Sequence, residues 1–320
     1  MTGGKPKVVV VGSIYVDMAI RCDQFPDTAE LVHGSSFSYT PTGSGLNQAI
    51  QAALCGCQVT LVGKVGNDPF GQMAIENLAH FGINCDFIFE AEAKNTGVTV
   101  SFVNSAGVNR TVFSYGANNA LMPADINGTK FEELLSSANI CLINGQLPQD
   151  FVSAAIRAAK LANKKVILDP SLPGGEFHRQ IVSLPPDYYT ADILVPNFVE
   201  AAELINPQNH NIHNAKLIGA DLIERGIGCA VIKLGRRGAL VIDKDGTDHI
   251  PSFDVKIVDH TGCGDAFDGA LAASCAVGDE IRNAVKFASA AGALACSKFG
   301  AQESLPKKEE IIELLQNLPD

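Results

Sequence analysis

The segment Asn139–Asp169 reads NICLINGQLPQDFVSAAIRAAKLANKKVILD, and its pattern decides the fold class. Two short apolar runs, Asn139–Asn144 and Lys165–Asp169, flank an alanine-rich stretch, Gln149–Ala162, that is long enough for a helix. A strand, a helix and a second strand in this order form a unit whose two strands lie parallel in one sheet. The segment therefore predicts a parallel β-sheet that is covered by helices.

The same alternation of strands and helices continues on both sides of this segment. Lys7–Gly12, with the sequence KVVVVG, has the β-branched composition of a buried strand. Further strands are predicted at Gln58–Gly63, Asp192–Val195, Cys229–Leu234 and Ala239–Asp243. Further helices are predicted at Leu46–Gly56, Pro69–Phe81, Asn197–Ile205, Ala215–Arg225, Gly264–Val277, Ile281–Phe299 and Lys308–Leu318. We therefore expect an α/β fold, a three-layer α/β/α sandwich with a mainly parallel sheet.

Four other segments alternate apolar and polar residues, as strands with one solvated face do. They are Val16–Cys22, Leu31–Thr40, Gly97–Asn104 and Asn109–Tyr115. We expect them to form two hairpins of a small β-sheet lid, contributed by about residues 14–41 and 96–116. No repeat or low-complexity linker divides the chain, so we expect residues 1–320 to form a single domain.

Composition excludes several classes of protein. Of the 320 residues, 46% are hydrophobic and 18% are charged, which supports a large core and excludes a disordered chain. The 24 basic and 35 acidic side chains give a net charge of −11, which argues against nucleic acids and anionic membranes as partners. No apolar run approaches the ~20 residues of a membrane span. Nine cysteines without a CxxC pair fit a reducing compartment, so we expect a cytoplasmic protein.

In open α/β sheets, ligands bind beyond the carboxyl ends of the strands. The loops that follow the predicted strands are therefore candidates for the functional site. They are Gly12–Asp17, Asn144–Pro148, Asp169–Ser171, Pro196–Glu200 and Gly235–Gly238.

The stretch Val258–Gly269 reads VDHTGCGDAFDG and carries the clearest chemical signal. Gly262 and Gly264 stand before an apolar helical pattern, so backbone N–H groups at a helix N-terminus can form an anion site. Asp265 lies in the first turn, where it can cap the helix or take a proton from a hydroxyl; the spacing leaves both open. GxxxxGK[ST] and GxGxxG are absent, which excludes a Walker-type site and disfavours a dehydrogenase.

Several ordered motifs resemble those of the ribokinase family, the phosphofructokinase-B-type carbohydrate kinases. Asp259–Gly269 is similar to the family's C-terminal signature, D-T-x-G-A-G-D-x-F-x-G, with His260 and Cys263 as variants. Gly43–Gly66 is similar to the N-terminal signature, and Asn197–Glu200 to the N-x-x-E motif. Further matches are Gly12–Asp17, Phe25–Pro26, Gly116–Asn118 and Gly300–Gln302. The resemblance covers nearly the whole chain.

This resemblance implies a ribokinase-like fold and an ATP- and Mg²⁺-dependent kinase. Such a kinase transfers the γ-phosphate to a hydroxymethyl group of a sugar or sugar-like acceptor. Asp265 is implied to be the general base. The backbone anion hole of residues 262–265 is implied to use the amides of Gly262, Cys263 and Gly264. Glu200 is implied to hold Mg²⁺ through water, together with Asn197, although these two residues also fit a helix cap.

The resemblance also implies positions for the nucleotide and a second cation. The residues implied to bind ATP are Asn197, Lys233, Gly235, Arg237, Gly238 and Gly264. Gly235–Gly238 also fits a β-turn between two strands. A monovalent cation such as K⁺ is implied at Asp259, Thr261, Gly300 and Ser304.

The acceptor pocket departs from the family pattern. The residues implied to contact the acceptor are Tyr15, Asp17, Gly43, Ser44 and Asn47. Ser44 stands where ribokinases have lysine, Tyr15 replaces an asparagine, and Pro148 replaces a glutamate. Because three polar ligands are changed, we do not expect D-ribose to be the best acceptor.

Alternative interpretations remain open for the acceptor and for single residues. Tyr15 and Phe37 offer aromatic surface, so a nucleoside kinase of the same family is an alternative. A sugar-binding sensor without catalysis is a non-kinase alternative. Asn47 also fits a helix cap, and Asp17 a solvated residue of the lid. Half-buried lid strands need a partner surface, so we expect a homodimer formed through the lid.

Overall fold

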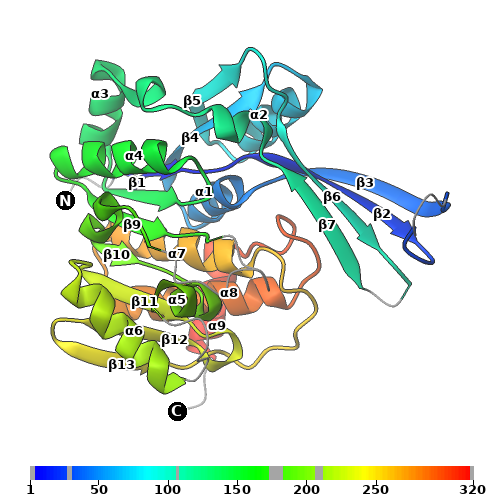
Figure 1. Ribbon diagram of the computed structural model, residues 1–320. Coiled ribbons are helices and arrows are strands. Elements are labelled where there is room, and N and C mark those ends of the chain that lie inside the picture. The colour runs from blue at the N-terminus through cyan, green and yellow to red at the C-terminus, as the bar shows by residue number, and fades with distance from the viewer. Residues whose placement is uncertain (1–3, 27–30, 106–107, 173–182, 206–211, 318–320) are drawn as a thin grey trace.

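The computed structural model describes residues 4–26, 31–105, 108–172, 183–205 and 212–317, and over these residues it shows a large and a small β-sheet (Figure 1). The large sheet has the order β13-β12-β11-β10-β9-β8-β1-β4-β5. Its strands are β13 (Gly246–Ile250), β12 (Ala239–Asp243), β11 (Cys229–Lys233), β10 (Ile193–Leu194), β9 (Lys165–Asp169), β8 (Ile140–Asn144), β1 (Lys7–Val11), β4 (Gln58–Gly66) and β5 (Asn84–Ala91). Neighbours from β5 to β11 pair in parallel. In the described part of this large sheet, the antiparallel pairs are β11–β12 and β12–β13.

Helices cover both faces of this sheet because alternate strand residues point to opposite sides. In β1, Val8 and Val10 belong to one apolar core, and Val9 and Val11 belong to the other. The first core includes residues of α1 (Ser44–Leu54), α2 (Pro69–His80), α7 (Cys263–Val277), α8 (Ile281–Cys296) and α9 (Lys308–Gln316). The second includes residues of α3 (Thr129–Ser137), α4 (Gln149–Leu161), α5 (Phe198–Ile205) and α6 (Ile212–Glu224). The predicted three-layer α/β/α sandwich is confirmed.

The small sheet projects away from the sandwich (Figure 1). Its order is β3-β2-β6-β7, with β2 (Tyr15–Cys22), β3 (Gly34–Thr42), β6 (Gly97–Val103) and β7 (Asn109–Ser114). Two antiparallel hairpins, β2–β3 and β6–β7, join through a parallel pairing of β2 with β6. The predicted small sheet is thus present. Residues 27–30 of the predicted lid segment, and Leu318 of the last predicted helix, lie outside the described residues.

Some elements differ from the sequence-based expectation. The strands β5 and β13 and the helix α3 were not predicted. β13 has the polar sequence GTDHI and lies at the sheet edge, mostly exposed, so no apolar pattern indicates it. The helix predicted at Ile281–Phe299 ends at Cys296, and the helix predicted from Ala215 begins at Ile212.

Two glycines bring helix α1 against the end of strand β1. A Cβ atom on Gly12 would lie 2.4 Å from the Cα atom of Gly45, a distance that real Cβ atoms do not reach. The amide of Leu46 donates a hydrogen bond of 3.2 Å to the carbonyl of Ser13. The start of α1, with Ser44 and Asn47, is therefore held at the carboxyl ends of the sheet strands.

The base of the lid is fastened by the buried side chain of Asn118. Its Oδ1 accepts a hydrogen bond from the amide of Ile14 at 2.9 Å. Its Nδ2 donates to the carbonyls of Ile14 at 2.7 Å and Tyr115 at 3.0 Å. Ile14 precedes the first lid hairpin and Tyr115 follows the second, so one side chain links two of the four connections between the lid and the sandwich.

Candidate active site

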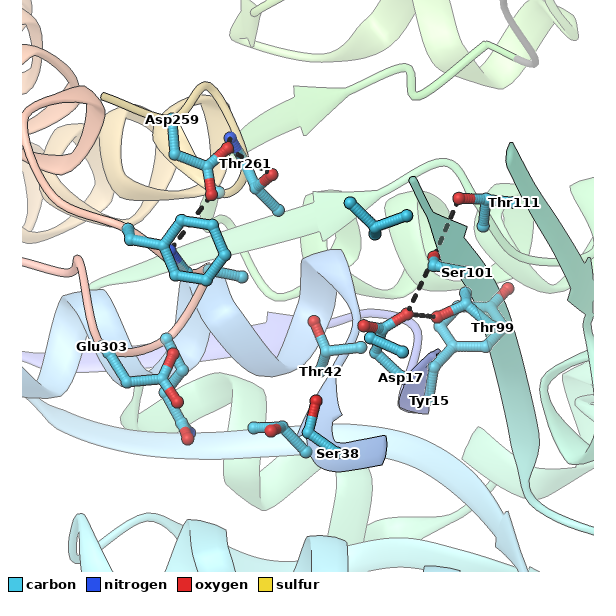
Figure 2. A pocket seen from close by; sticks show the side chains of 18 of the residues that line it. Tyr15, Asp17, Ser38, Thr42, Thr99, Ser101, Thr111, Asp259, Thr261 and Glu303 are labelled. Atoms are coloured by element: carbon cyan, nitrogen blue, oxygen red, sulfur yellow. Dashed lines mark hydrogen bonds between the residues drawn. The ribbon is translucent and has the colours of Figure 1, made fainter. Parts of the chain in front are cut away.

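A pocket of about 1230 Å³ lies between the lid and the sandwich (Figure 2). It is lined by residues of both lid hairpins, the start of α1, the loop before α7 and the segment Gly300–Glu303. The predicted site residues that line it are Tyr15, Asp17, Gly43, Ser44, Asn47, Asp259, Thr261, Gly262, Asp265 and Gly300. The predicted residues that do not line it are Asn197, Glu200, Lys233, Gly235, Arg237, Gly238, Cys263, Gly264 and Ser304.

Asp265 lies in the first turn of α7 and faces the N-terminal part of α1. Its Oδ2 accepts a hydrogen bond from Asn47 Nδ2 at 3.0 Å, and its Oδ1 accepts one from Gln48 Nε2 at 3.4 Å. Burial raises the pKa of Asp265 to about 6; the Asn47 hydrogen bond lowers it, and the negative charge of Asp169 raises it further. A carboxylate with such a pKa can accept a proton near neutral pH.

The start of α7 is shaped by Gly262. This residue has φ 76°, in the left-handed region, and a Cβ atom on it would lie 2.9 Å from the carbonyl oxygen of Ala301. Only glycine combines that conformation with such a close approach. The first turn of a helix presents N–H groups that lack intrahelical partners and attract negative charge. The fold therefore brings an anion-attracting helix end to the pocket that Asp265 lines.

Cys263 is the first residue of α7 and lies beside Cys296, the last residue of α8. Its Sγ donates a hydrogen bond of 2.9 Å to the carbonyl of His260. The thiol of Cys296 lowers the pKa of Cys263 to about 7, which the nearby Lys233 charge also favours. The Cys263 thiol therefore releases its proton readily at this helix end, whereas the Cys296 thiol keeps its proton.

Asp17 projects from β2 into the pocket beside hydroxyl groups of the neighbouring strands (Figure 2). Its Oδ1 accepts hydrogen bonds from Thr99 and, at 3.5 Å, from Ser101. Ser101 in turn contacts the hydroxyl of Thr111 at 2.8 Å. The inner face of the lid is therefore a hydroxyl- and carboxylate-rich surface, which suits a ligand with several hydroxyl groups.

Three residues discussed for the acceptor pocket are placed as follows by the structure. Tyr15 lines the pocket; it is 3% exposed, and its hydroxyl is buried without a hydrogen-bond partner among the described residues. Gln146, and not Pro148, lines the pocket, and its Oε1 accepts a hydrogen bond from Ser13 at 3.0 Å. Phe37 lies outside the pocket, 58% exposed, whereas Phe113 lines it.

Behind the pocket, a buried polar network joins the ends of β8 and β9 to α1. Asp169 Oδ2 accepts hydrogen bonds from Gln48 at 2.9 Å, Asn144 at 3.0 Å and Ser171 at 3.0 Å. Gln48 also reaches Asp265, so the network continues to the start of α7. The strand-end rule pointed to Asn144 and Asp169, but no motif assigned them a role, and Gln48 was missed.

Lys233, at the end of β11, forms an ion pair with Asp268 of α7. The Nζ atom lies 2.8 Å from Oδ2, and the Asp268 side chain is only 1% exposed. Burial alone would lower the pKa of Lys233, but Asp268 and, more weakly, Asp169 and Glu200 raise it. The ammonium group is therefore charged and held beneath the first turn of α7.

Asn197 and Glu200 form a reciprocal cap at the start of α5. Asn197 Oδ1 accepts hydrogen bonds from the amides of Val199 at 2.9 Å and Glu200 at 3.0 Å. Glu200 Oε2 accepts one from the amide of Asn197 at 2.7 Å. Burial raises the pKa of Glu200 to about 7, and the charge of Asp169 adds to the rise. Asn197 and Glu200 thus form the expected helix cap. In addition, the carboxylates of Glu200 and Asp169 repel each other at this end of the sheet.

The chain matches the pfkB family of carbohydrate kinases over residues 5–308. It belongs to this family. It is 31% identical over 313 residues to ribokinase of Bacillus subtilis, covering 96% of this chain and 99% of that one. It is 29% identical over 308 residues to deoxyribokinase of Salmonella typhi, covering 96% and 98%. The structure of Arabidopsis thaliana ribokinase complexed with ribose and ATP is similar with a TM-score of 0.89 and 26% identity, covering 98% of this chain and 99% of that one.

In this pfkB-family protein, three of the four residues expected at a monovalent cation lie together. Asp259 Oδ1 accepts hydrogen bonds from the amide of Thr261 at 2.9 Å and its hydroxyl at 2.7 Å. Asp259 Oδ2 accepts one from the amide of Gly300 at 3.1 Å. Ser304 instead donates to the carbonyl of Ala301 at 3.0 Å. Although burial raises the pKa of Asp259, the Thr261 and Gly300 hydrogen bonds lower it overall.

The turn expected to contact ATP in this pfkB-family chain follows β11. Gly235–Arg237 forms a short 3₁₀ helix, and the amide of Leu234 donates to the carbonyl of Gly238 at 2.7 Å. The guanidinium of Arg237 lies 5.3 Å from the ring centre of Phe198. The turn between strands is therefore formed as the sequence indicates, and it lies beside the start of α5.

Proposed function

We propose that this protein is an ATP- and Mg²⁺-dependent kinase that phosphorylates a hydroxymethyl group of a sugar, within one domain of residues 1–320. One observation carries the proposal: Asp265 stands at the N-terminus of α7 and lines the same pocket as Asp17 and the hydroxyl-rich lid. A base, an anion-attracting helix end and a polyol-binding surface are the groups that phosphoryl transfer to a sugar hydroxyl needs.

Asp265 takes the proton from the acceptor hydroxyl as that oxygen attacks the γ-phosphate. Its pKa of about 6 means that most of the carboxylate is deprotonated at neutral pH and yet remains basic. The backbone amides of residues 262–265 face the negative charge that develops on the transferred phosphoryl group. Lys233, held by Asp268, adds a positive charge beneath the same helix turn.

The acceptor lies between the lid and α1. Asp17 accepts hydrogen bonds from neighbouring hydroxyls of the sugar, as a carboxylate does for vicinal donors. Asn47 Oδ1 is buried and has no hydrogen-bond partner among the described residues, so it can accept a hydrogen bond from a hydroxyl of the sugar. Gly43, whose φ is 116°, brings backbone to the pocket wall where Ser44 begins α1.

Mg²⁺ fits the acidic end of the sheet. The negative charge of Asp169 raises the pKa of Glu200 there, and a divalent cation would relieve that repulsion. Glu200 would hold the ion through water, with Asn197 beside it, because Mg²⁺ keeps several of its waters. The ion supplies charge neutralisation on the nucleotide phosphates. We place the nucleotide along Gly235, Arg237 and Gly238.

Further parts of the proposal concern the cation, the compartment and the oligomer. K⁺ is proposed beside Asp259, Thr261, Gly300 and Ser304, whose hydroxyl bonds to the carbonyl of Ala301 in the same loop. All nine cysteines are unpaired, which fits the cytoplasm. No helix in the described part of the chain is long and apolar enough to cross a membrane. We also propose a homodimer through the outer face of the lid.

A sugar is favoured over a nucleoside because only one of the two aromatic residues invoked for a base lines the pocket. Tyr15 lines it but packs against Gly97, where an added Cβ would lie 2.6 Å from the Tyr15 ring, and Phe37 faces outward. The relatives named ribokinase and deoxyribokinase support a pentose. With Gln146 present, the argument against D-ribose rests on Ser44 alone. The loss of one hydrogen bond there corresponds to a kcat/KM for D-ribose that is lower by about tenfold or less.

The experiment is a coupled assay of ADP release with D-ribose, 2-deoxy-D-ribose, hexoses and nucleosides at fixed ATP and Mg²⁺. We expect turnover with a pentose and at least about tenfold lower kcat/KM with every nucleoside. A nucleoside as the best acceptor would contradict the sugar assignment. Sugar binding by calorimetry without turnover on any acceptor would favour the sensor.

A further inference from the structure

A histidine and two cysteines converge at the junction of α7 and α8. His260 lies in the loop before α7, Cys263 is the first residue of α7, and Cys296 is the last residue of α8. One ligand atom of each, an imidazole nitrogen or a thiol sulfur, lies within 4.8 Å of the other two. Among the described residues no other group of this kind is found.

This combination of ligand atoms matches the preferences of zinc. Thiolates and imidazoles are the usual ligands of Zn²⁺, at about 2.3 Å for sulfur and about 2.0 Å for nitrogen. A tetrahedral centre with these bond lengths spaces its ligand atoms by about 3.5–3.8 Å. The cluster needs a contraction of at most about 1.3 Å. Rotation of the exposed His260 side chain can supply it for the imidazole nitrogen, and small rotations of the two cysteine side chains for the sulfur atoms.

We propose that His260, Cys263 and Cys296 form a three-ligand binding site for Zn²⁺ with one open coordination position. Each thiol that binds releases its proton to solvent, and no oxidation is involved. The hydrogen bond from Cys263 Sγ to the carbonyl of His260 is given up for the metal bond. The open position is filled by water.

The position of the site indicates what the bound ion does. The carbonyl of Cys296 already accepts hydrogen bonds from the amides of Val258 at 2.8 Å and Asp259 at 3.2 Å. The ion would tie this junction to the first residue of α7, whose amide belongs to the proposed anion hole. If the proposed kinase activity holds, Zn²⁺ therefore inhibits phosphoryl transfer by fixing the helix end that must adapt to the phosphate.

The test uses Co²⁺ as a spectroscopic substitute for Zn²⁺ on the purified full-length protein. We expect intense visible absorption from tetrahedral Co²⁺ with thiolate ligands, saturating at roughly one ion per chain and abolished by Zn²⁺. Cys296→Ser should weaken Co²⁺ binding by about 10- to 100-fold or more and remove much of the absorption. Cys85→Ser, a partly buried thiol on β5, is the matched control and should leave both unchanged.

The readout separates this proposal from the kinase assignment, because metal binding is measured without any substrate. His260→Ala, at an exposed position, provides a second test should Cys296→Ser fail to fold. Unchanged Co²⁺ absorption in both variants would overturn the site. Loss of both free thiols on exposure to glutathione disulfide, with no Co²⁺ binding by the reduced protein, would also overturn it and indicate a disulfide pair instead. Zn²⁺ inhibition of kinase activity that Cys296→Ser relieves would support it.

Discussion

At the scale of single residues, Asp265 combines a raised pKa with hydrogen bonds that keep its carboxylate oriented. Asn47 and Gln48 donate to its two oxygens from α1, so the carboxylate is held toward the pocket. Its pKa is about 6 against an ordinary value of 3.8, and burial is the largest cause. The raised pKa suits the proposed role of Asp265 as a base, and it also implies a cost to stability.

Replacing Asp265 by Asn should lower kcat by about 10²- to 10⁴-fold while ATP binding is retained. In the unchanged protein, kcat/KM should fall as the pH drops below about 6, because the base becomes protonated. Steady-state kinetics from pH 5 to 8, the range around that pKa, measure the loss of kcat and the fall of kcat/KM. Calorimetry measures whether ATP binding is retained. A variant within about threefold of normal turnover would remove Asp265 from the mechanism.

The same substitution should stabilise the protein above pH 6. The folded state holds a proton on Asp265 up to about pH 6, whereas the unfolded chain loses it near 3.8, so stability falls as the pH rises between these values. Asp265→Asn removes that loss, and we expect a gain of about 1–3 kcal/mol in unfolding free energy at pH 7.5. At pH 3.5 the gain should vanish. Urea unfolding at the two pH values measures it.

At the scale of elements, Asn118 fixes how the lid meets the sandwich. Two of the four segments that connect the lid to the sandwich, before β2 and after β7, are hydrogen-bonded to this one buried side chain. The parallel pair β2–β6 joins the two hairpins of the lid. The geometry of the pocket depends on that fastening.

Asn118→Ala should lower the unfolding free energy by about 2–4 kcal/mol, because it leaves the buried amide and carbonyl of Ile14 without partners. In the folded variant, the KM for the acceptor should rise more than the KM for ATP. Asn119→Ala, at the exposed neighbouring position, is the matched control and should change neither value appreciably. Equal effects of the two substitutions would show that Asn118 does not fasten the lid.

The sequence predicted elements well where a local pattern marked them and poorly where contacts are distant. The alternation in Gly97–Asn104 and the KVVVVG run each identified a strand, because burial of one face or of both leaves a local trace. Asp169 and Gln48 meet across 121 positions of the chain, and no spacing reveals such a contact. The sequence also does not show that Gly97 lies against Tyr15, where an added Cβ would be 2.6 Å from the Tyr15 ring.

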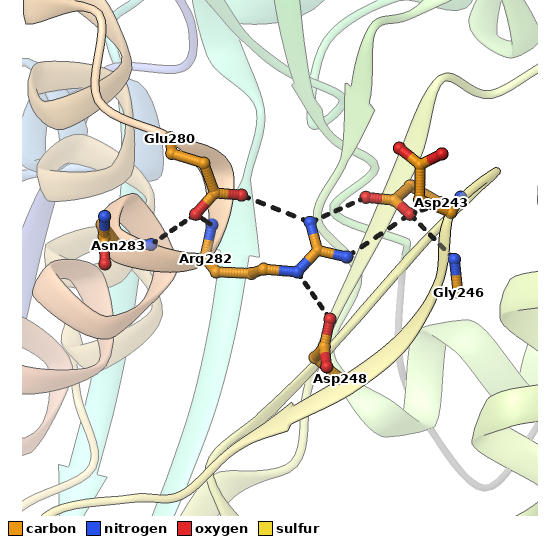
Figure 3. A network of polar contacts seen from close by, with 7 residues as sticks. Asp243, Gly246, Asp248, Glu280, Arg282 and Asn283 are labelled. Atoms are coloured by element: carbon orange, nitrogen blue, oxygen red, sulfur yellow. Dashed lines mark hydrogen bonds and ion pairs between the residues drawn. The ribbon is translucent and has the colours of Figure 1, made fainter.

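At the scale of the whole molecule, Arg282 of α8 ties the C-terminal helices to the antiparallel edge of the sheet (Figure 3). Its guanidinium lies 3.0 Å from Asp243 on β12, 2.5 Å from Asp248 on β13 and 3.2 Å from Glu280. Burial raises the pKa of Asp243, but the Arg282 hydrogen bond lowers it overall. The guanidinium of Arg282 thus bridges carboxylates of β12 and β13 to the N-cap residue of its own helix, Glu280.

Arg282→Ala should lower the unfolding free energy by about 1–2 kcal/mol at neutral pH and low salt. A lowered carboxyl pKa stabilises the fold above the unfolded value near 3.8, so the difference from the unchanged protein should shrink as the pH falls below that value. It should also shrink in high salt. Lys286→Ala, an exposed basic residue of the same helix, is the control. A loss that is independent of pH and salt would point to packing instead.

The outer face of the lid is apolar, in contrast to its inner face. Phe37, Tyr39 and Val112 are 58%, 52% and 70% exposed there, and Met18 and Ile20 pair opposite Tyr39 and Phe37. If this face forms the proposed dimer, Phe37→Glu should yield monomers in analytical ultracentrifugation at micromolar protein concentration. Leu161→Glu, at an exposed position on α4, should leave the oligomeric state unchanged. A monomeric unchanged protein would contradict the dimer.

The hydrogen bond between Asn47 and Asp265 joins residues 218 positions apart, and this has a consequence for synthesis on the ribosome. The lid and the start of α1 leave the exit tunnel long before α7 is translated. If the proposed roles hold, a nascent chain released early would carry the acceptor-binding surface but no base, and it would bind substrate without phosphorylating it. On the same proposal, the protein becomes active only when the last third of the chain packs against the first.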